Sequence, residues 1–370
     1  METSTLLAPP RKTEDNGGIM LMLLIFILAG AFSSIAREMG CVDSVVNLTL
    51  SVLPCNFILV GLFVASCLVS LSIGTSCGTI AALVPIAVGV ASSTFSSVPM
   101  ATAAVVGGSL FGDNLSFISD TTIMATKTQG CRMSDKFRAN LGIALPAALV
   151  AVVAYLFLGR GIEAQSATES GNLLNILPYV LVFVLALAGL NVIWVLVVGI
   201  VSAGAIGLCR GVMDPNSLWE ATKNGVLGMH DLIVITILAA VVIDQLRKRG
   251  AIEWLTKNMG RLVSTRRGAE LSIAGAVVAV DMLTANNTIA ILAVGPVARS
   301  ISYRYGIDAS RSASILDTMS CFAQGIIPWG AQLLIAAGLA SINPLDIIPY
   351  LYYPYILGTF TILYILFRKK

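Results

Sequence analysis

The chain has 370 residues, of which 56% are hydrophobic and 12% are charged, with a formal net charge of +3 and a mean hydropathy of +0.88. Soluble domains carry about 25% charged residues, so this composition excludes an ordinary soluble domain and predicts a polytopic membrane protein whose main partner is the lipid bilayer. The charges show no footprint of a nucleic-acid-binding protein, and the seven cysteines lack the spacing of a zinc site or a disulfide framework.

The first part of the chain is expected to hold a polar segment, one spanning helix and a hairpin. Residues 1–18 are polar and lack the basic front of a signal peptide, and an apolar helix follows from residue 19. The apolar stretch 55–91 would be about 55 Å long as one helix, too long for a hydrocarbon core of about 30 Å. Its weak centre, SIGTSCGT at 72–79, therefore predicts two helices that meet at a tip.

The stretch GDNLSFISDTT at 112–122 places two carboxylates inside an otherwise apolar run. A charged side chain in bilayer hydrocarbon costs about 2.5 to 3.5 kcal/mol, so such residues usually face a cavity and mark an ion path. We expect a broken helix over 100–126 that opens within the stretch 112–122, with Gly112 at its front and small hydroxyl residues behind, and that frees backbone carbonyls for a cation. The alternative is an ordinary loop outside the membrane between two short helices.

The second part of the chain repeats this pattern. A helical pair is expected over 173–208, followed by a second hairpin over 269–298 and a second broken helix over 310–340. Adding 211 to positions of the first part reaches their counterparts without a gap. We therefore expect the chain to contain repeat 1 at 19–159 and repeat 2 at 229–370, with the helical pair 173–208 between them.

Loop charges predict the orientation of the repeats. The positive-inside rule puts the basic loops 127–138 and 247–267 in the cytoplasm, together with both termini. The first hairpin then enters from outside and the second from inside. Charges do not separate hairpins that re-enter from hairpins that span fully, but irregular polar tips favour re-entry. The predicted fold is an all-α polytopic membrane protein with inverted-topology repeats, two re-entrant hairpins and discontinuous transmembrane helices.

The repeat also implies a missing segment. The helical pair 173–208 precedes the second repeat, and subtracting 211 places its counterpart before residue 1. We therefore expect this chain to lack two N-terminal helices. Sequence directly upstream, read in the same frame, tests this expectation.

The run at 112–122 resembles the GD-(K/N)-x-S-x-x-SDTT signature of the NhaC-type Na⁺/H⁺ antiporters. The second half is also similar to this family at Asp281, Asn286, Asn287, Thr288, Leu316, Asp317, Thr318, Gln324, Gly325 and the stretch 328–332. The resemblance covers nearly the whole chain. It implies a mobile transport domain that works against a scaffold, no cofactor, and exchange of Na⁺ for H⁺ across the cytoplasmic membrane of a bacterium. A homodimer through scaffold helices is a further expectation. Some relatives exchange malate and lactate, so organic-acid antiport is the alternative.

The residue types indicate how such a site would work. Sodium prefers oxygen ligands, and a carboxylate in a cavity can hold either H⁺ or Na⁺. We expect Asp113 and Asp120 to be the titrating pair and the Na⁺ ligands. The other expected ion-binding residues are Asn114, Ser116, Ser119, Thr121, Thr75, Ser76, Asn286, Asn287, Thr288, Asp281 and Gln324.

Each of these residues also has a structural interpretation. A single Ser or Thr often only bonds back to its own helix, and Asn286 and Asn287 could simply join helices. Asp281 and Asp317 could be second proton carriers or partners of basic residues.

An enzyme is a remote alternative. Residues 74–78 satisfy G-x-S-x-G, a motif of serine hydrolases, so the alternative is an intramembrane serine protease that uses Ser76 and His230. That motif needs a strand-to-helix turn, whereas apolar helical patterns flank it here.

Overall fold

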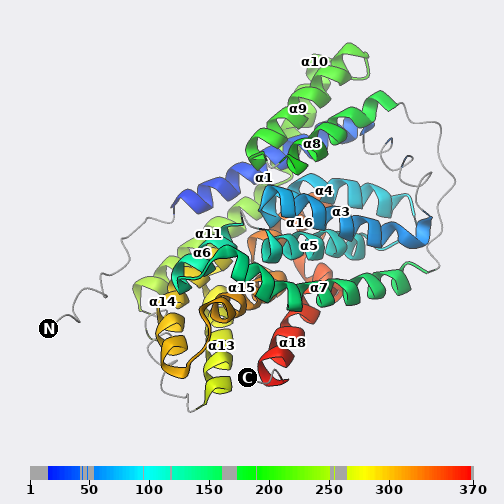
Figure 1. The fold of residues 1–370 in the computed structure, drawn as a ribbon. Helices are drawn as coiled ribbons and strands as arrows, with labels where there is room; N and C mark the ends of the chain where they lie inside the picture. The colour runs from blue at the N-terminus through cyan, green and yellow to red at the C-terminus, as the bar shows by residue number, and fades with distance from the viewer. Residues whose placement is uncertain are drawn as a thin grey trace.

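The computed structural model describes residues 16–41, 44, 48, 54–94, 96–116, 119–160, 173–188, 190–250, 254 and 265–367. Within these ranges the chain is helical and contains no β-strand element, so the predicted all-α class is confirmed (Figure 1). Most of the polar segment 1–18 and of the basic loop 247–267 lies outside the described residues.

The helices follow one another in two similar series. The first series is α1 (Asn16–Glu38), α3 (Ile58–Ile73), α4 (Ser76–Ser92), α5 (Val98–Leu115), α6 (Asp120–Gln129) and α7 (Met133–Leu158). The second is α11 (His230–Lys248), α13 (Arg266–Thr284), α14 (Asn287–Tyr305), α15 (Ala309–Ile326), α16 (Ala331–Ala340), α17 (Pro344–Ile347) and α18 (Tyr352–Phe367). Between them lie α8 (Leu177–Leu187), α9 (Val192–Cys209) and α10 (Pro215–Leu227).

Helix ends in the two series coincide after a constant shift. Adding 211 to residues 73, 76, 98, 115, 120 and 129 gives 284, 287, 309, 326, 331 and 340, which are helix ends of the second series. The two series therefore break at equivalent places in the chain. Breaks at the same places in both series indicate that the interruptions belong to the architecture and are not local accidents of sequence.

Both hairpins turn through one residue in the left-handed region. Gly74, with φ of 74°, ends α3, and Thr75 is the N-cap of α4. In the second hairpin Ala285 takes the same role with φ of 50°, and the side chain of Asn286 caps α14 by accepting a hydrogen bond from the Ile289 N–H. Glycine adopts this conformation without strain, whereas alanine does not.

The break of the first half falls between Leu115, where α5 ends with Ser116 as its C-cap, and Asp120, where α6 begins, which is inside the stretch 112–122. Gly112 lies within α5 and does not itself end the helix. The glycine is instead required by packing, because a Cβ there would lie 2.2 Å from the Cβ and Oγ of Ser70 on α3. In the second half the break falls between α15 and α16, after Ile326.

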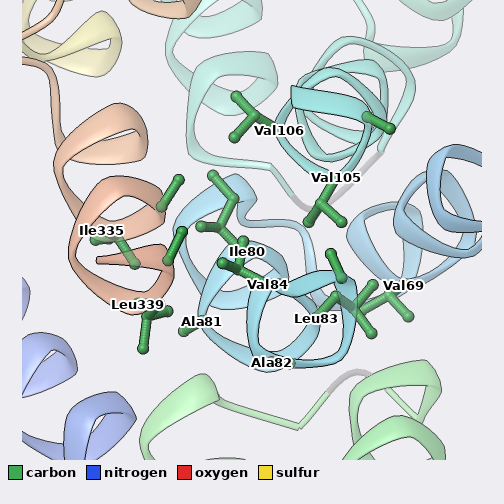
Figure 2. Packing of buried hydrophobic residues seen from close by; sticks show 14 of the residues in the cluster. Val69, Ile80, Ala81, Ala82, Leu83, Val84, Val105, Val106, Ile335 and Leu339 are labelled. Atoms are coloured by element: carbon green, nitrogen blue, oxygen red, sulfur yellow. The ribbon is translucent and has the colours of Figure 1, made fainter. Parts of the chain in front are cut away.

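The two series interlock through their hairpins. The second arm of each hairpin packs on the second half-helix of the other series, α4 on α16 and α14 on α6. Figure 2 shows the first of these interfaces, where Ala81 of α4 lies beside Leu339 of α16, with Val105 and Val106 of α5 on another side of α4. Because α4 is enclosed by α3, α5 and α16, most of its side chains are buried in protein.

Four helical stretches among the described residues are long and apolar enough to cross a membrane: Cys55–Ser72, Met133–Leu158, Val192–Cys209 and Ala309–Ala340. The pair Pro344–Tyr350 and Tyr352–Phe367, bent by 55°, would make a fifth if it is one span. In the most apolar 18-residue stretch of Ala309–Ala340, 72% is buried inside the protein, against 33% in the corresponding stretch of Met133–Leu158. The former therefore lies in the protein interior. Helix α7 instead carries an exposed apolar stripe of the kind that faces lipid, formed by Leu145, Leu149, Val153 and Phe157.

Candidate functional site

Asp113 lies at the tip of the first hairpin. Its side chain, on the last turn of α5, is 3% exposed, and its Oδ1 accepts a hydrogen bond from the backbone N–H of Ser76 at 3.1 Å. Ser76 is the first residue of α4, so the carboxylate faces the N-terminal end of a helix, where unpaired N–H groups stabilise an anion. The structure thus brings two predicted site residues from separate segments into direct contact.

Asp120 does not share this enclosure. It is the first residue of α6, and its side chain is exposed, whereas Ser119 and Thr121 on either side are buried, with their hydroxyl oxygens 2.7 Å apart. The hydroxyl of Thr121 approaches the backbone carbonyl oxygen of Asp113 at 3.5 Å, and that of Thr122 approaches it at 3.4 Å. The two acids therefore occupy different environments, and of the two only Asp113 is enclosed by protein.

A buried lysine holds the break between α5 and α6. Lys136 of α7 is 1% exposed, and its Nζ donates to the carbonyl oxygen of Asn114 at 2.9 Å and to the hydroxyl of Thr122 at 2.6 Å. Asp317 of α15, which is fully buried, pairs with this ammonium at 2.8 Å. Asn140, one turn further along α7, donates to both the Asn114 carbonyl and Asp317 Oδ2. The ends of both half-helices are thus tied to the second half of the chain.

A chain of side-chain amides joins the two hairpin tips. Gln324 of α15 donates from Nε2 to the carbonyl oxygen of Ala285 at 3.1 Å and to Gln332 Oε1 at 2.7 Å. Gln332 of α16 then donates from its own Nε2 to the hydroxyl of Ser76 at 3.0 Å. Since Ser76 holds Asp113, the second hairpin is connected to the acid of the first. Gln324 is also the counterpart of Asp113, because 113 shifted by 211 is 324.

Asp281 is the most isolated acid of the described chain. It lies on α13, one turn before the second hairpin tip, is fully buried, and neither of its carboxylate oxygens has a hydrogen-bond partner among the described residues. An ionised carboxylate buried without a partner is costly. A cation or a proton at Asp281 would remove that cost.

The other predicted site residues have local structural roles. Asn287 Oδ1 accepts from the Thr288 N–H, and Ser116 donates to the carbonyl oxygen of Leu71 at 3.1 Å. The Asn114 side chain donates to the Leu110 carbonyl and the Tyr353 hydroxyl. Thr75 and Asn286 are the N-caps already described. Within the part of the chain that the structure describes, the amide atoms Gln324 Oε1 and Asn287 Nδ2 have no hydrogen-bond partner.

The motif that suggested a protease lies at a junction between two helices and not after a strand. The hydroxyl of Ser76 accepts a hydrogen bond from Gln332, and its backbone N–H binds Asp113. His230 is exposed at the start of α11, where its Nδ1 contacts the carbonyl oxygen of Leu227.

The sequence analysis assigned no site role to Lys136, Asn140 or Gln332, although Gln332 lies in the stretch 328–332 that resembles the family. Lys136 was counted among the basic residues of a cytoplasmic loop, since it follows Lys127 and Arg132. A signal was nevertheless present. Lys136 and Asn140 continue at helical spacing into a series of small residues, Ala144, Ala147, Ala148 and Ala151, all of them buried. A polar residue in line with a small-residue face predicts an inward position.

The donor set suits a monovalent hard cation better than a resident metal. Among the described residues, no group of three or more His, Cys, Asp and Glu side chains is placed to hold a metal ion. The site at the first hairpin tip offers one carboxylate, that of Asp113, together with hydroxyl groups. Na⁺ accepts both types of ligand.

Comparisons with known proteins identify the family of the chain. A family model described as the Na⁺/H⁺ antiporter family matches residues 15–160 and 166–369. The chain is 25% identical over 390 residues to the Na⁺/H⁺ antiporter NhaC of Bacillus subtilis, covering 95% of this chain and 84% of that protein. It is 22% identical to the malate-2H⁺/Na⁺-lactate antiporter of the same organism, covering 92% and 80%. A crystal structure of the YdaH transporter of Alcanivorax borkumensis aligns with a TM-score of 0.45 at 14% identity, covering 96% and 88%.

Proposed function

The chain belongs to the Na⁺/H⁺ antiporter family, and from this premise we propose that it exchanges Na⁺ for H⁺ across a bacterial cytoplasmic membrane by alternating access. The observation that carries the proposal is the buried Asp113 carboxylate at the tip of the first hairpin. The relatives named above are antiporters, in keeping with a transporter and not an enzyme.

Asp113 would bind the two ions in turn. Its Oδ1 is engaged by the Ser76 N–H, so we assign its second oxygen, Oδ2, to the transported ion. We assign neutral oxygen ligands to the hydroxyls of Thr121, which approaches the backbone carbonyl of Asp113, and of Ser119, which contacts Thr121. Because a proton and Na⁺ compete for the same carboxylate, loading one releases the other, and this competition is sufficient for exchange.

Asp120 takes a different role in this scheme. Its exposed position at the start of α6 places a negative charge at the edge of the site, outside the enclosed part. A carboxylate there attracts cations toward Asp113 without being a second inner ligand.

The membrane arrangement is proposed along with the activity. The hairpins α3–α4 and α13–α14 re-enter from opposite sides, the basic loops and both termini are cytoplasmic, and α8 and α9 belong to a scaffold through which two copies pair. The enclosure of α4 by protein supports re-entry, because irregular backbone at membrane depth is tolerated only where protein or water surrounds it.

Organic-acid exchange is less well supported by the geometry. A malate or lactate carboxylate needs a cationic side chain with unused donors. Lys136, the buried cation nearest in sequence to the break after Asp113, already donates to the Asn114 carbonyl, the Thr122 hydroxyl and the Asp317 carboxylate, so none of its three donors is unused. The cation-binding interpretation needs no such residue.

The test is the dissipation of a pH gradient in everted membrane vesicles. Addition of NaCl should dissipate the gradient, whereas KCl should not, and Asp113→Asn should abolish the response while the protein remains in the membrane. Asparagine can still accept from the Ser76 N–H, so this variant removes charge more than structure. Lys223→Gln, at an exposed pair with Glu220 on α10, is the matched control and should transport normally. A response to sodium malate alone would replace the proposal by organic-acid antiport.

A further inference from the structure

The ammonium of Lys136 is bound in the way a free cation would be. Three oxygens of different types surround it: the Asn114 carbonyl at 2.9 Å, the Thr122 hydroxyl at 2.6 Å and the Asp317 carboxylate at 2.8 Å. These groups come from α5, α6 and α15. With a side chain 1% exposed, Lys136 holds them out of contact with solvent.

We propose that Lys136 is the resident cation of the α5–α6 break, and that together with Asp317 it positions Asp113 and sets the charge balance around it. This proposal rests on the proposed function. It assigns the Asn114 carbonyl at the end of α5 to the protein's own lysine, so that this carbonyl is not a ligand of the transported ion.

Hydrogen-bond capacity supports this division. A broken helix exposes unsatisfied carbonyls at its C-terminal end, which carries partial negative charge and suits a cation. The Asn114 carbonyl is such a group, and it accepts from both Lys136 Nζ and Asn140 Nδ2. A carbonyl oxygen has two lone pairs, so this one has none left for a transported ion.

Charge balance supports the positioning role. The charges that act directly on Asp113 are those of Asp317 on α15 and Asp120 on α6. Around it, Cys77 on α4 faces Asp113 and Asp120, and Cys321 on α15 faces Asp113, Asp317, Lys136 and Asp281. Lys136 and Asp317 cancel each other as a pair. Removing either charge alone would leave one uncompensated charge near Asp113, with a sign that depends on which partner is removed.

This sign dependence defines the experiment. In vesicles at alkaline pH, the apparent KM for Na⁺ should fall about tenfold in Lys136→Gln, because the unpaired Asp317 attracts cations. It should rise by a similar factor in Asp317→Asn, where the unpaired lysine repels them. In the double variant Lys136→Gln with Asp317→Asn the apparent KM should return to within about threefold of the wild-type value, because neutral groups of similar shape replace the pair.

Two further variants keep the test decisive if a single variant does not fold. Asn140→Asp adds a negative charge beside the pair while Lys136 stays, so it should lower the apparent KM as Lys136→Gln does. Arg132→Gln removes an exposed charge that contacts neither Lys136 nor Asp317 and should leave the apparent KM within threefold. The exposed pair Arg132–Asp135, near the same end of α7, is the control for charge changes at a distance.

A purely structural role predicts a different result. If the pair only held the fold together, the single variants would lower protein yield or the maximal rate with the apparent KM unchanged, and the proposal would be overturned. The same shift in both single variants would also overturn it. Wild-type protein that does not exchange Na⁺ would instead overturn the proposed function itself.

Discussion

Gln332 donates a hydrogen bond to the hydroxyl of Ser76 at 3.0 Å, across 256 residues of chain. The bond joins the second half-helix of one series to the hairpin tip of the other. Because Ser76 also holds Asp113 and Gln324 holds both Gln332 and the Ala285 carbonyl, one run of hydrogen bonds passes from hairpin to hairpin through the acid. Movement of either tip would disturb the geometry at Asp113.

Gln332→Leu should therefore slow transport more than it weakens binding. The change removes the donor to Ser76 and the acceptor of Gln324, and leaving buried polar groups unpaired costs about 1–3 kcal/mol. We expect a lower melting temperature and a maximal rate reduced about tenfold. Ser76→Ala is the matched variant, since it loses the hydroxyl but keeps the N–H that binds Asp113. Unchanged rates in both variants would show that the run of hydrogen bonds has no part in transport.

Gly112→Ala tests the close packing of α5 on α3. The added Cβ would lie 2.2 Å from Ser70, and overpacking of this kind costs about 1–3 kcal/mol. Gly142→Ala is the control, because nothing lies within 4 Å of its Cβ position on α7 and alanine favours a helix. Thermal unfolding in detergent should show a loss for the first and no loss for the second. Equal stability of the two variants would contradict the packing explanation.

Exchanging glycine and alanine should affect the stability of the protein differently at the two hairpin tips. Gly74→Ala forces alanine into a left-handed conformation with φ of 74° and should destabilise by about 1–2 kcal/mol. Ala285→Gly relieves the same strain at φ of 50°, partly offset by the entropy of glycine, and should change stability by less than about 1 kcal/mol. Melting temperatures of the two variants test this. The prediction fails if Ala285→Gly is the more damaging change.

Asp281→Asn should keep the fold and lose exchange. The fully buried side chain has no hydrogen-bond partner among the described residues, so its charge is not needed by a structural contact. Asp281→Ser is the second variant. Position 281 is the counterpart of Ser70, whose hydroxyl donates to the Ser109 carbonyl at 2.6 Å. Both variants should unfold near the wild-type temperature with exchange reduced at least about tenfold, as for a lost proton-binding group. Full activity in either would assign Asp281 to packing.

Asp214, which lies outside the membrane, should make the stability of the folded protein depend on pH. The Ser217 backbone N–H, which binds the carboxylate in a capping box at the start of α10, holds the pKa of Asp214 below its usual range. A lowered folded-state pKa stabilises the protein above the unfolded value of about 3.9, and the effect is lost as pH falls through the folded value. The difference in melting temperature between wild type and Asp214→Ala should stay constant from pH 8 to 5 and shrink below about pH 4. A difference that grows on acidification would contradict the cap.

Several features of the fold could be predicted because they depend on composition and spacing. The Gly/Ser/Thr centre at 72–79 marked the break at Gly74, and the 211-residue shift matched helix ends in both series. The residue at which the first broken helix ends could not be predicted within the stretch 112–122, because Gly112 has two possible meanings. Glycine ends helices, but it also permits helices to approach closely, and only the position of Ser70 distinguishes the two cases.

The site was only partly predictable for a related reason. Asp113 and Asp120 have the same residue type, and nothing in the local pattern shows that one is enclosed and the other exposed. Lys136 meets Asp317 across 181 residues, and Gln332 meets Ser76 across a longer separation. Contacts between residues so far apart in the chain depend on how the two series interlock, which periodicity within one segment does not contain.

The constant shift of helix ends has an evolutionary consequence. If the two halves arose by gene duplication, the copies diverged by substitution alone from the hairpins through the half-helices, because an insertion would have moved the ends apart. Ser70 and Asp113 in one copy stand where Asp281 and Gln324 stand in the other. Each copy therefore carries one of the two buried acids, Asp113 or Asp281, at non-equivalent positions. Divergence from a symmetric ancestor would then have given the two halves different roles.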